Sequence, residues 1–272
     1  MDFKKTIFVL PNLLTAASLF CGMYAILRCI GADVTDEDAY RASLLLFYAF
    51  IFDLFDGRVA RMTKTQSAFG VEFDSLADLV SFGVAPAVIA YRWSLESAEY
   101  VGAFVAFLYV LAGALRLGRF NLLSHKPKPK AAGPDKYMLG LPIPMAAAFV
   151  ISLLLAERAM GGWPWLTEYG LRIRGEEYPI MLVVMVVLAL LMVSKVRFRS
   201  FKDLRINVVS IALVAVVVGG SAVVGFLYSP AYILIALLLT YVLFGFFGAI
   251  FTWPRRRREK RAAREEGSKP SA

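Results

Sequence analysis

Apolar residues fall in blocks of about 20 along most of the chain, and this feature constrains the possible folds most strongly. A helix of about 20 apolar residues is long enough to cross the hydrocarbon core of a bilayer. Hydrophobic residues make up 59% of the 272 residues, and the mean hydropathy is +0.64. Soluble proteins average about 45–50% apolar residues. We therefore expect an all-α protein, a polytopic transmembrane helical bundle.

The pattern predicts about eight membrane spans, and no polar stretch between them is long enough to form a soluble domain. The spans are expected at residues 7–29, 42–62, 75–93, 100–122, 140–159, 178–195, 206–227 and 231–252. Residues 1–253 are therefore predicted to form a single membrane domain. Residues 254–272 are charged, and we expect a basic cytoplasmic tail that is disordered or lies against anionic headgroups.

The charges of the loops alternate along the chain. The loops GADVTDEDAY and SLESAEY are acidic, whereas SHKPKPK, SKVRFRSFKDLR and RRRREKRAAR are basic. Since Lys and Arg collect on the cytoplasmic side, we predict an integral protein of the cytoplasmic membrane with both termini in the cytoplasm. The same rule accounts for the net charge of +9 without a nucleic-acid partner. The first apolar block follows only Lys4 and Lys5 and can itself span, so no cleaved signal peptide is expected.

The two cysteines and the single histidine do not suggest a metal site. Cys21 and Cys29 are eight residues apart, which fits neither a zinc site nor a redox motif. We expect both to serve as packing residues. His125 falls in a basic loop, so a histidine-based metal site is not expected.

Four aspartates lie within 26 residues of this apolar sequence, namely Asp53, Asp56, Asp74 and Asp78. Spacings of three and four residues put each pair on one face of a helix. The pairs end the second predicted span and begin the third, so we expect them to meet in a pocket that faces the cytoplasm. A carboxylate inside a membrane helix costs about 2.5–3.5 kcal/mol, and four of them need compensating positive charge. Carboxylates are hard ligands, which predicts two divalent cations, Mg²⁺ or Mn²⁺.

Small residues and one arginine separate the two pairs of aspartates. Gly57, Ala60 and Gly70 keep the surface small, so that a diphosphate can approach the backbone and the metals. Arg61 is placed to pair with a phosphate, and Ser67 is placed to add a hydroxyl donor. The residues alone therefore predict metal-assisted displacement at a phosphate group beside a membrane.

The aspartates belong to a longer motif, D-x2-D-G-x2-A-R-x8-G-x3-D-x3-D, and every fixed position of it is filled. The motif resembles the signature of the CDP-alcohol phosphotransferases, which displace CMP from a CDP-linked lipid or alcohol by an acceptor hydroxyl. The resemblance implies that Asp53, Asp56 and Asp74 hold the metals, and that Asp78 touches a metal and acts as the general base. It also implies a homodimer, and contacts to the CDP group from Gly57, Arg61 and Ser67.

Four blocks of sequence resemble the membrane-embedded CDP-diacylglycerol–serine O-phosphatidyltransferases. They are LPNLLTAASLFCGMYAI (10–26), DSLADLVSFGVAPA (74–87), ALRLGRFN (114–121) and GLPIPMAAA (140–148). The blocks span the first five predicted helices, and Gly118 stands where we would expect alanine. This resemblance implies transfer of the phosphatidyl group of CDP-diacylglycerol to the hydroxyl of L-serine, giving phosphatidylserine and CMP.

Two of these blocks suggest substrate contacts. The Pro-Asn pair is expected to break the entry to the first helix, either as an N-terminal cap or to place Asn12 and Thr15 along the nucleotide pocket. Arg116 and Arg119 lie three residues apart at the cytoplasmic end of the fourth span. With Asn121 they are predicted to bind the carboxylate of serine, while a plain membrane-surface anchor would account for one of them.

Other functions stay open at this point. The same chemistry fits another acceptor, such as glycerol 3-phosphate, an inositol phosphate or choline. Between Gly57 and Asp78 the only cations are Arg58, Arg61 and Lys64, which favours an acceptor without its own phosphate. An ether-linked donor would make the protein an archaetidylserine synthase. A cation transporter is a remoter alternative, since transporter aspartates usually lie near mid-membrane on broken helices.

Overall fold

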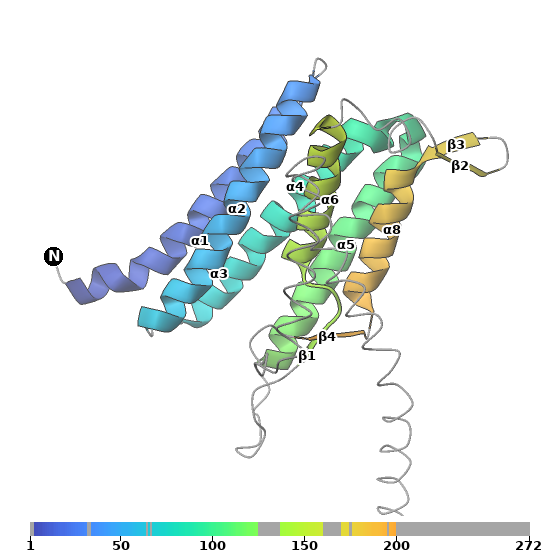
Figure 1. Ribbon diagram of the computed structural model, residues 1–272. Helices are drawn as coiled ribbons and strands as arrows, with labels where there is room; N and C mark the ends of the chain where they lie inside the picture. The colour runs from blue at the N-terminus through green and yellow to red at the C-terminus, as the bar shows by residue number, and fades with distance from the viewer. Residues whose placement is uncertain are drawn as a thin grey trace, which may run out of the picture.

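Helices make up most of the chain that the structure, a computed structural model, describes (Figure 1). It describes residues 3–31, 34–63, 65, 67–124, 137–159, 170–173, 176–194 and 196–199. The α-helices are α1 (Phe3–Arg28), α2 (Asp36–Thr63), α3 (Ala68–Asp78), α4 (Ala85–Ala90), α5 (Glu99–Ser124), α6 (Ile143–Ala159) and α8 (Ile180–Val193). Three further segments join α3, α4 and α5, namely the π-helical η1 (Leu79–Val84) and η2 (Tyr91–Leu95) and the 3₁₀ turn η3 (Glu96–Ala98).

Six of the eight predicted spans lie in the described residues, and each coincides with a helix or a run of helical segments. The prediction of a helical bundle is therefore confirmed for this part of the chain. The predicted span 75–93 corresponds to the run from α3 to η2, which already begins at Ala68. The predicted spans 206–227 and 231–252, the tail 254–272 and His125 lie outside the described residues.

The proline near the N-terminus does not mark the start of the first helix, contrary to the expectation from the sequence. Helix α1 begins at Phe3 and runs through Pro11. Proline has no N–H to bond to the preceding turn. One turn later, Thr15 Oγ1 lies 3.1 Å from the carbonyl oxygen of Pro11. Asn12 and Thr15 therefore lie on an established helix rather than at its cap.

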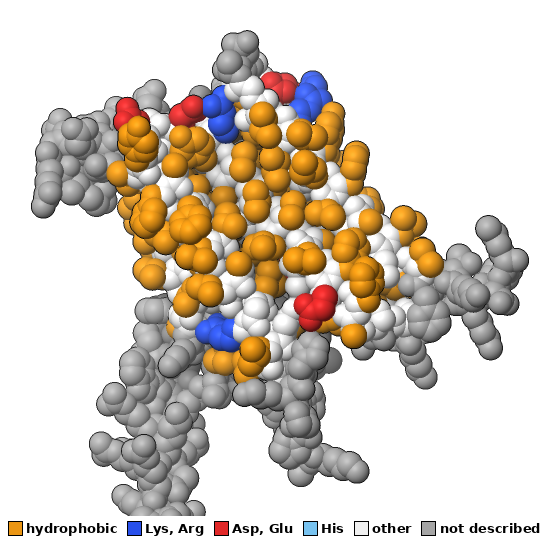
Figure 2. Space-filling model, turned by 180° about the vertical axis from the view of Figure 1, so that it is seen from behind, with side chains coloured by type: hydrophobic (Ala, Val, Ile, Leu, Met, Phe, Trp, Pro, Cys, Tyr) orange, Lys and Arg blue, Asp and Glu red, His pale blue; other side chains and the backbone are white. Residues whose placement is uncertain are grey.

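Two described helical stretches, Val9–Arg28 and Ala68–Leu123, are long and apolar enough to cross a membrane. The second folds back at Glu99, whose φ of 46° is uncommon for a residue with a side chain. Ile143–Ala156 and Ile180–Val193 form shorter apolar helices. Figure 2 shows hydrophobic side chains over the middle of one face, with charged side chains at its upper and lower ends. These features fit the predicted class, a helical membrane protein.

Two helix pairs flank a buried centre. Helix α1 packs along α2, and α5 packs along α8, while η1 and α4 contact α1, α2, α5 and α6 between them (Figure 1). Phe82, Ile89 and Tyr109 are fully buried there. Cys21 and Cys29 are free and buried, in keeping with a packing role.

Small and polar residues hold η1 between its neighbours. Ser18 Oγ donates to a carbonyl of α2 at 3.0 Å, and Ser81 Oγ donates to the carbonyl oxygen of Ser18 at 3.1 Å. A Cβ atom on Gly22 would lie 2.6 Å from Ser81 Oγ, so glycine allows this close approach. On the other side of η1, Tyr109 Oη donates to the carbonyl oxygen of Phe82 at 3.3 Å. These contacts fix the segment that directly follows α3.

Four short strands add to the helices, and the sequence patterns did not predict them. Strand β1 (Tyr137–Leu139) pairs antiparallel with β4 (Arg197–Arg199), with Met138 opposite Phe198. Strand β2 (Gly170–Ile173) pairs antiparallel with β3 (Glu176–Pro179). Each strand has only three or four residues, too few for a recognisable alternation of apolar and polar side chains.

Candidate active site

Asp53, Asp56 and Asp74 meet where the second half of α2 faces α3. One carboxylate oxygen from each lies within 4.8 Å of those of the other two. The spacing of three residues puts Asp53 and Asp56 on one face of α2, and α3 brings Asp74 to that face. Asp56 is 5% exposed, and the other two are partly buried. Carboxylates this close together repel one another in their charged form, so the arrangement favours a bound cation.

Thr15 of α1 orients the most buried of these carboxylates. Its Oγ1 lies 2.7 Å from Asp56 Oδ2 and donates a hydrogen bond to it. Thr15 is itself buried. A carboxylate has two oxygens and about four lone-pair sites, so Asp56 can accept this bond and still bind a metal. Thr15, predicted to line the nucleotide pocket, therefore directly contacts the aspartate cluster.

Ser67 begins α3 as its N-cap. Its backbone is extended, and its Oγ accepts a hydrogen bond from the backbone N–H of Gly70 at 3.0 Å. Asn12 reaches the same place from α1. A Cβ atom on Gly70 would lie 3.1 Å from Ser67 Oγ and 3.3 Å from Asn12 Oδ1. The structure thus brings three of the predicted CDP contacts together, and it gives Ser67 a capping role that the sequence did not suggest.

Gly57, Ala60 and Arg61 follow Asp56 on the last turns of α2. The guanidinium of Arg61 turns back along the helix, and its Nη1 would lie 3.5 Å from a Cβ atom on Gly57. Arg61 also interacts electrostatically with Asp56. The rim beside the aspartates therefore consists of small residues and one exposed guanidinium, a surface suited to a phosphate group.

Asp78 lies one turn beyond Asp74, at the end of α3. Its carboxyl group contacts that of Asp53 and interacts electrostatically with Asp74 and Arg116. Arg116 comes from α5, is 7% exposed, and has its guanidinium 5.7 Å from the centre of the Phe120 ring. Asp78 thus joins the aspartate cluster and is within electrostatic range of a buried arginine.

Arg119 lies one turn further along α5 and contacts a different part of the protein. Its guanidinium donates to the carbonyl oxygens of Leu139 at 2.9 Å and Val193 at 3.0 Å, with longer bonds to other carbonyls at the end of α8. The last carbonyls of a helix have no partner within it, and Arg119 supplies one. The two arginines predicted to bind serine therefore differ, since Arg116 is near the aspartates and Arg119 is at the end of α8.

Asn121 bonds to two residues of α3 that the sequence did not single out. Its Nδ2 donates to Ser75 Oγ at 3.0 Å and to Glu72 Oε2 at 3.2 Å. Neither residue has the helical spacing to Asp74 that marks a shared face. Only the tertiary arrangement of α5 beside α3 reveals these contacts. They hold the end of α5 beside the turn that carries Asp74.

The side chains present fit a hard divalent cation. Within the described residues the cluster offers only carboxylate oxygens, the ligands that Mg²⁺ and Mn²⁺ prefer. The closeness of three acids, one of them deeply buried, is the observation that supports a metal here. The number and kind of ions belong to the proposal below.

A helical bundle with an aspartate cluster shared by two helices, and a small-residue rim beside it, is an arrangement that suits an enzyme acting on phosphate groups. The sequence model of the CDP-alcohol phosphatidyltransferase family matches residues 8–253. The chain belongs to this family.

Relatives with assigned names cover most of the chain. A CDP-diacylglycerol–serine O-phosphatidyltransferase of Helicobacter pylori (strain ATCC 700392 / 26695) is 36% identical over 210 residues, which cover 77% of this chain and 80% of the relative. The protein of that name from Bacillus subtilis (strain 168) is 31% identical, covering 71% of this chain and 91% of the relative. An archaetidylserine synthase of Methanothermobacter thermautotrophicus is 40% identical, covering 57% of this chain and 61% of the relative.

Proposed function

We propose that this protein transfers the phosphatidyl group of CDP-diacylglycerol to the hydroxyl group of L-serine, giving phosphatidylserine and CMP. The observation that carries the proposal is the cluster of Asp53, Asp56 and Asp74, with oxygens within 4.8 Å of one another. The cluster lies within the complete motif of the family that matches residues 8–253. Relatives named for the serine reaction support the choice of acceptor.

Two divalent cations, Mg²⁺ or Mn²⁺, are proposed to bind Asp53, Asp56 and Asp74, with Asp78 as a further ligand. When bound, they supply positive charge to the diphosphate as the phosphorus is attacked. Thr15 holds Asp56 in position for this role.

The CDP group is proposed to lie on the rim formed by Asn12, Thr15, Gly57, Ala60, Arg61, Ser67 and Gly70. The absence of side-chain bulk at the two glycines lets the diphosphate approach the backbone. The guanidinium of Arg61 is placed to pair with a phosphate oxygen. The amide of Asn12, beside Gly70, offers a donor and an acceptor to the nucleotide.

Asp78 is proposed as the general base. The serine hydroxyl is a weak nucleophile and must lose its proton as its oxygen attacks phosphorus. The bond between that phosphorus and the oxygen of the departing CMP then breaks. Asp78 adjoins the cluster from the following turn of α3, so it can accept the proton beside the reacting phosphorus.

We propose Arg116 as the residue that binds the serine carboxylate. It is buried and interacts electrostatically with Asp78, the proposed base of the acceptor hydroxyl. Arg119 is proposed to act on the same site indirectly, by fixing α8 against α5. Asn121 of α5 is proposed to line the site through its hydrogen bond to Ser75 of α3.

The surroundings of the enzyme follow from its class. We propose a homodimer in the cytoplasmic membrane, with the aspartates facing the cytoplasm and lipids around the helices. The same chemistry with an ether-linked donor is the second candidate, because an archaetidylserine synthase is 40% identical over 157 residues. Other acceptors, such as glycerol 3-phosphate, an inositol phosphate or choline, and a cation transporter are weaker candidates.

Purified protein in detergent tests the proposal. CMP should appear only when CDP-diacylglycerol, L-serine and Mg²⁺ or Mn²⁺ are all present, and mass spectrometry should identify phosphatidylserine. Excess chelator should stop the reaction, and added cation should restore it. An ester-linked and an ether-linked donor, each tested with the four acceptors, separate the candidates. Turnover with glycerol 3-phosphate but not with serine would contradict the proposed acceptor.

An aspartate at the other end of α2 supplies a matched control for the cluster variants. Asp53→Asn and Asp56→Asn on α2, and Asp74→Asn on α3, should each nearly abolish turnover, because each removes an anionic ligand. Asp38→Asn changes an aspartate at the far end of α2, where Asp38 bonds to Arg28 and Thr35. Full activity of Asp38→Asn alongside inactive cluster variants would show that the loss is specific to the cluster.

A further inference from the structure

Three polar side chains of α3 and α5 form a hydrogen-bonded trio beside the aspartates, namely Glu72, Ser75 and Asn121. Asn121 Nδ2 donates to Ser75 Oγ at 3.0 Å and to Glu72 Oε2 at 3.2 Å. An ionised carboxylate only accepts hydrogen bonds, so Glu72 requires the nitrogen side of the Asn121 amide to face α3. Ser75 Oγ donates to the carbonyl oxygen of Val71 at 3.0 Å, a shorter bond than its 3.4 Å contact with Asn121 Oδ1. The directions of the hydrogen bonds within the trio are therefore determined.

The trio can offer a ligand acceptor oxygens rather than donors. The two N–H bonds of the Asn121 amide are used on Ser75 and Glu72, and the single O–H of Ser75 is used on Val71. The second carboxylate oxygen of Glu72 and a lone pair of Ser75 Oγ stay available to a donor. A ligand with a positive charge and several N–H bonds, such as an ammonium group, is complementary to this arrangement.

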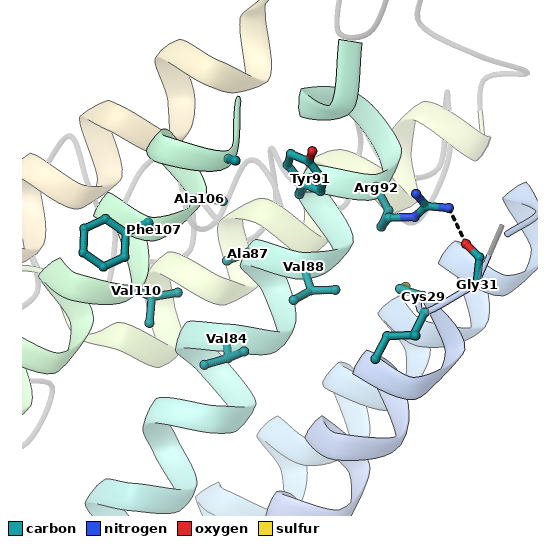
Figure 3. A pocket seen from close by; sticks show the side chains of 12 residues that line it. Cys29, Gly31, Val84, Ala87, Val88, Tyr91, Arg92, Ala106, Phe107 and Val110 are labelled. Carbon is teal, nitrogen blue, oxygen red and sulfur yellow. Dashed lines mark hydrogen bonds between the residues drawn. The ribbon is translucent and has the colours of Figure 1, made fainter. Parts of the chain in front are cut away.

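No ion pair balances the charge of Glu72 within the part of the chain that the structure describes. Its hydrogen-bond partner there is the neutral amide of Asn121. The opposite end of the helices is different. Arg92, which lines an apolar groove at that end, already donates to Glu96 and to the carbonyl oxygen of Gly31, both at 2.7 Å (Figure 3). The trio therefore keeps a negative charge for a cationic ligand.

The trio lies next to the proposed acceptor site, nearer the ends of the two helices. Ser75 precedes Asp78 by three residues, which puts the two on one face of α3 about 4.5 Å apart along the axis. On α5, Asn121 follows Arg116 by five residues, about 7.5 Å toward the end of the helix. The trio is thus one level beyond Asp78 and Arg116 between the same two helices. Glu72 is exposed, so a water-soluble molecule can reach the trio.

L-Serine has a third polar group, an ammonium, besides its hydroxyl and its carboxylate. The proposed roles of Asp78 and Arg116 account for the latter two. The ammonium and the hydroxyl are on neighbouring carbon atoms, so their partners have to lie within about 5.4 Å of each other, one helical turn. Ser75 meets this condition with respect to Asp78, and Glu72 adds the negative charge.

We propose that Glu72 and Ser75 bind the ammonium group of the acceptor, so that the trio selects alcohols with an amino group on the neighbouring carbon. Asn121 is a positioning residue, since its amide holds the two acceptors together across α3 and α5. The inference rests on the proposed function, because Asp78 and Arg116 define where the acceptor lies. An acceptor with a phosphate in place of the ammonium is repelled by Glu72, and such repulsion adds to specificity.

Acceptor analogues that each lack one group test this role on the full chain. 3-Hydroxypropionate has the hydroxyl and the carboxylate of L-serine without the ammonium, and ethanolamine has the hydroxyl and the ammonium without the carboxylate. CMP release with CDP-diacylglycerol and Mg²⁺ gives KM for L-serine, and competition against L-serine gives Ki for each analogue. Glu72→Gln removes the charge and keeps the shape of the side chain. Glu37→Gln is the matched control at the opposite end of the helices, where Glu37 pairs with Arg41.

Glu72→Gln should raise KM for L-serine and Ki for ethanolamine about 10- to 100-fold, the effect of losing a hydrogen bond to a charged group, while Ki for 3-hydroxypropionate changes less than about threefold. Ser75→Ala should show the same selectivity, and Glu37→Gln should match wild type. Arg116→Ala should show the reverse pattern, with weaker binding of 3-hydroxypropionate and little change for ethanolamine. Thermal unfolding shows that each variant is folded.

Equal weakening of all three ligands in Glu72→Gln, or no change in any of them, would overturn the proposal. The trio would then be a structural link between α3 and α5. Failure of the proposed function gives a different result, because it shows in the wild type. Wild-type protein that releases CMP with glycerol 3-phosphate but not with L-serine would contradict the proposed acceptor, whatever the variants do.

Discussion

At the scale of single residues, the hydroxyl of Thr15 is the contact that best links the fold to the chemistry. It connects α1 to the aspartate cluster through a 2.7 Å bond to Asp56. Loss of a group that holds a metal ligand in place typically lowers metal affinity or activity about 10- to 100-fold. The bond explains why the residues around Pro11 and Asn12 matter to the site. They belong to α1, and α1 has to place the Thr15 hydroxyl beside Asp56.

Thr15→Val keeps the shape of the side chain and removes the hydroxyl. We expect turnover, or the apparent affinity for Mg²⁺, to fall about 10- to 100-fold, because Asp56 loses the bond that orients it. Activation of the enzyme by titrated Mg²⁺ measures the effect. Thr15→Ser keeps the hydroxyl and should stay within a few-fold of wild type. Equal behaviour of the valine and serine variants would remove the role assigned to the hydroxyl.

Asp78→Asn tests the base assignment separately from metal binding. It should retain binding of CDP-diacylglycerol and lower kcat by about 10²–10⁴, the usual contribution of a general base. Binding is measured with labelled CDP-diacylglycerol in the absence of serine, and kcat by release of CMP. Normal turnover of this variant would assign the proton transfer to another group.

The two arginines of α5 should differ in kinetics. Arg116→Ala is expected to raise KM for serine about 10- to 100-fold, the effect of losing a hydrogen bond to a charged group, with a smaller change in KM for CDP-diacylglycerol. Arg119→Ala removes bonds to the end of α8, so it should lower thermal stability more than it changes the serine KM. Initial rates at varied serine concentration give KM, and thermal unfolding gives the Tm of each variant. Together they distinguish a serine-binding arginine from a structural one. An unchanged serine KM in Arg116→Ala would place the acceptor carboxylate elsewhere.

At the scale of helices and segments, the π-helical segment η1 is the least regular element near the site. It directly follows Asp78 and is held by Ser81 against α1 and by Tyr109 against α5. π-Helical turns inside α-helices often occur at functional sites. Because α3 continues into η1, the contacts of Ser81 with Ser18 and Gly22 also set the rotation of the helix that carries Asp74 and Asp78.

Gly22→Ala should disturb this contact. The new Cβ atom would lie 2.6–2.9 Å from atoms of Ser81, including 2.7 Å from its backbone Cα, so α1 and η1 have to separate. We expect a loss of about 1–3 kcal/mol in stability and reduced turnover, as for other overpacked cores. Gly118→Ala is the matched control on α5, where nothing lies within 4 Å of the added atom. Thermal unfolding and CMP release of both variants should therefore differ clearly.

The sequence could predict the helices and the aspartate cluster, but not the contacts between distant segments. Apolar blocks of about 20 residues and spacings of three and four depend only on local order, so six spans and the meeting of Asp53, Asp56 and Asp74 were predictable. The bond between Thr15 and Asp56 joins residues 41 positions apart, and that of Asn121 to Ser75 joins residues 46 apart. No periodicity within one helix encodes such pairs. The same holds for Arg119, whose partners on α8 are more than 70 residues away.

At the scale of the whole molecule, hydrogen bonds between distant segments show which connections lie at the same end of the helices. Arg92 bonds to the carbonyl of Gly31, which places the α1–α2 connection beside η2 and η3. Asn121 bonds to Ser75, which places the end of α5 at the aspartate end. At the first end Glu37, Asp38 and Glu96 pair with Arg41, Arg28 and Arg92, whereas Arg58, Arg61, Arg116 and Arg119 are at the second end with the aspartates. The basic loops of the sequence add to the second end, and this is the difference that the positive-inside rule describes.

The last prediction concerns the orientation that this difference implies. Reporter fusions after Ala98, in the η3 turn, and at the C-terminus should report opposite sides of the membrane, with the C-terminus in the cytoplasm. A third fusion at Thr65, between α2 and α3, should agree with the C-terminus, because the basic loops add to the aspartate end. A fusion at Thr65 that agrees with Ala98 would contradict the two-ended arrangement of the described helices. Agreement between Ala98 and the C-terminus, with Thr65 on the other side, would instead mean an odd number of crossings after α5. With Thr65 in the cytoplasm the aspartates would then keep their predicted side, but both the predicted span count of eight and the predicted cytoplasmic C-terminus would fail.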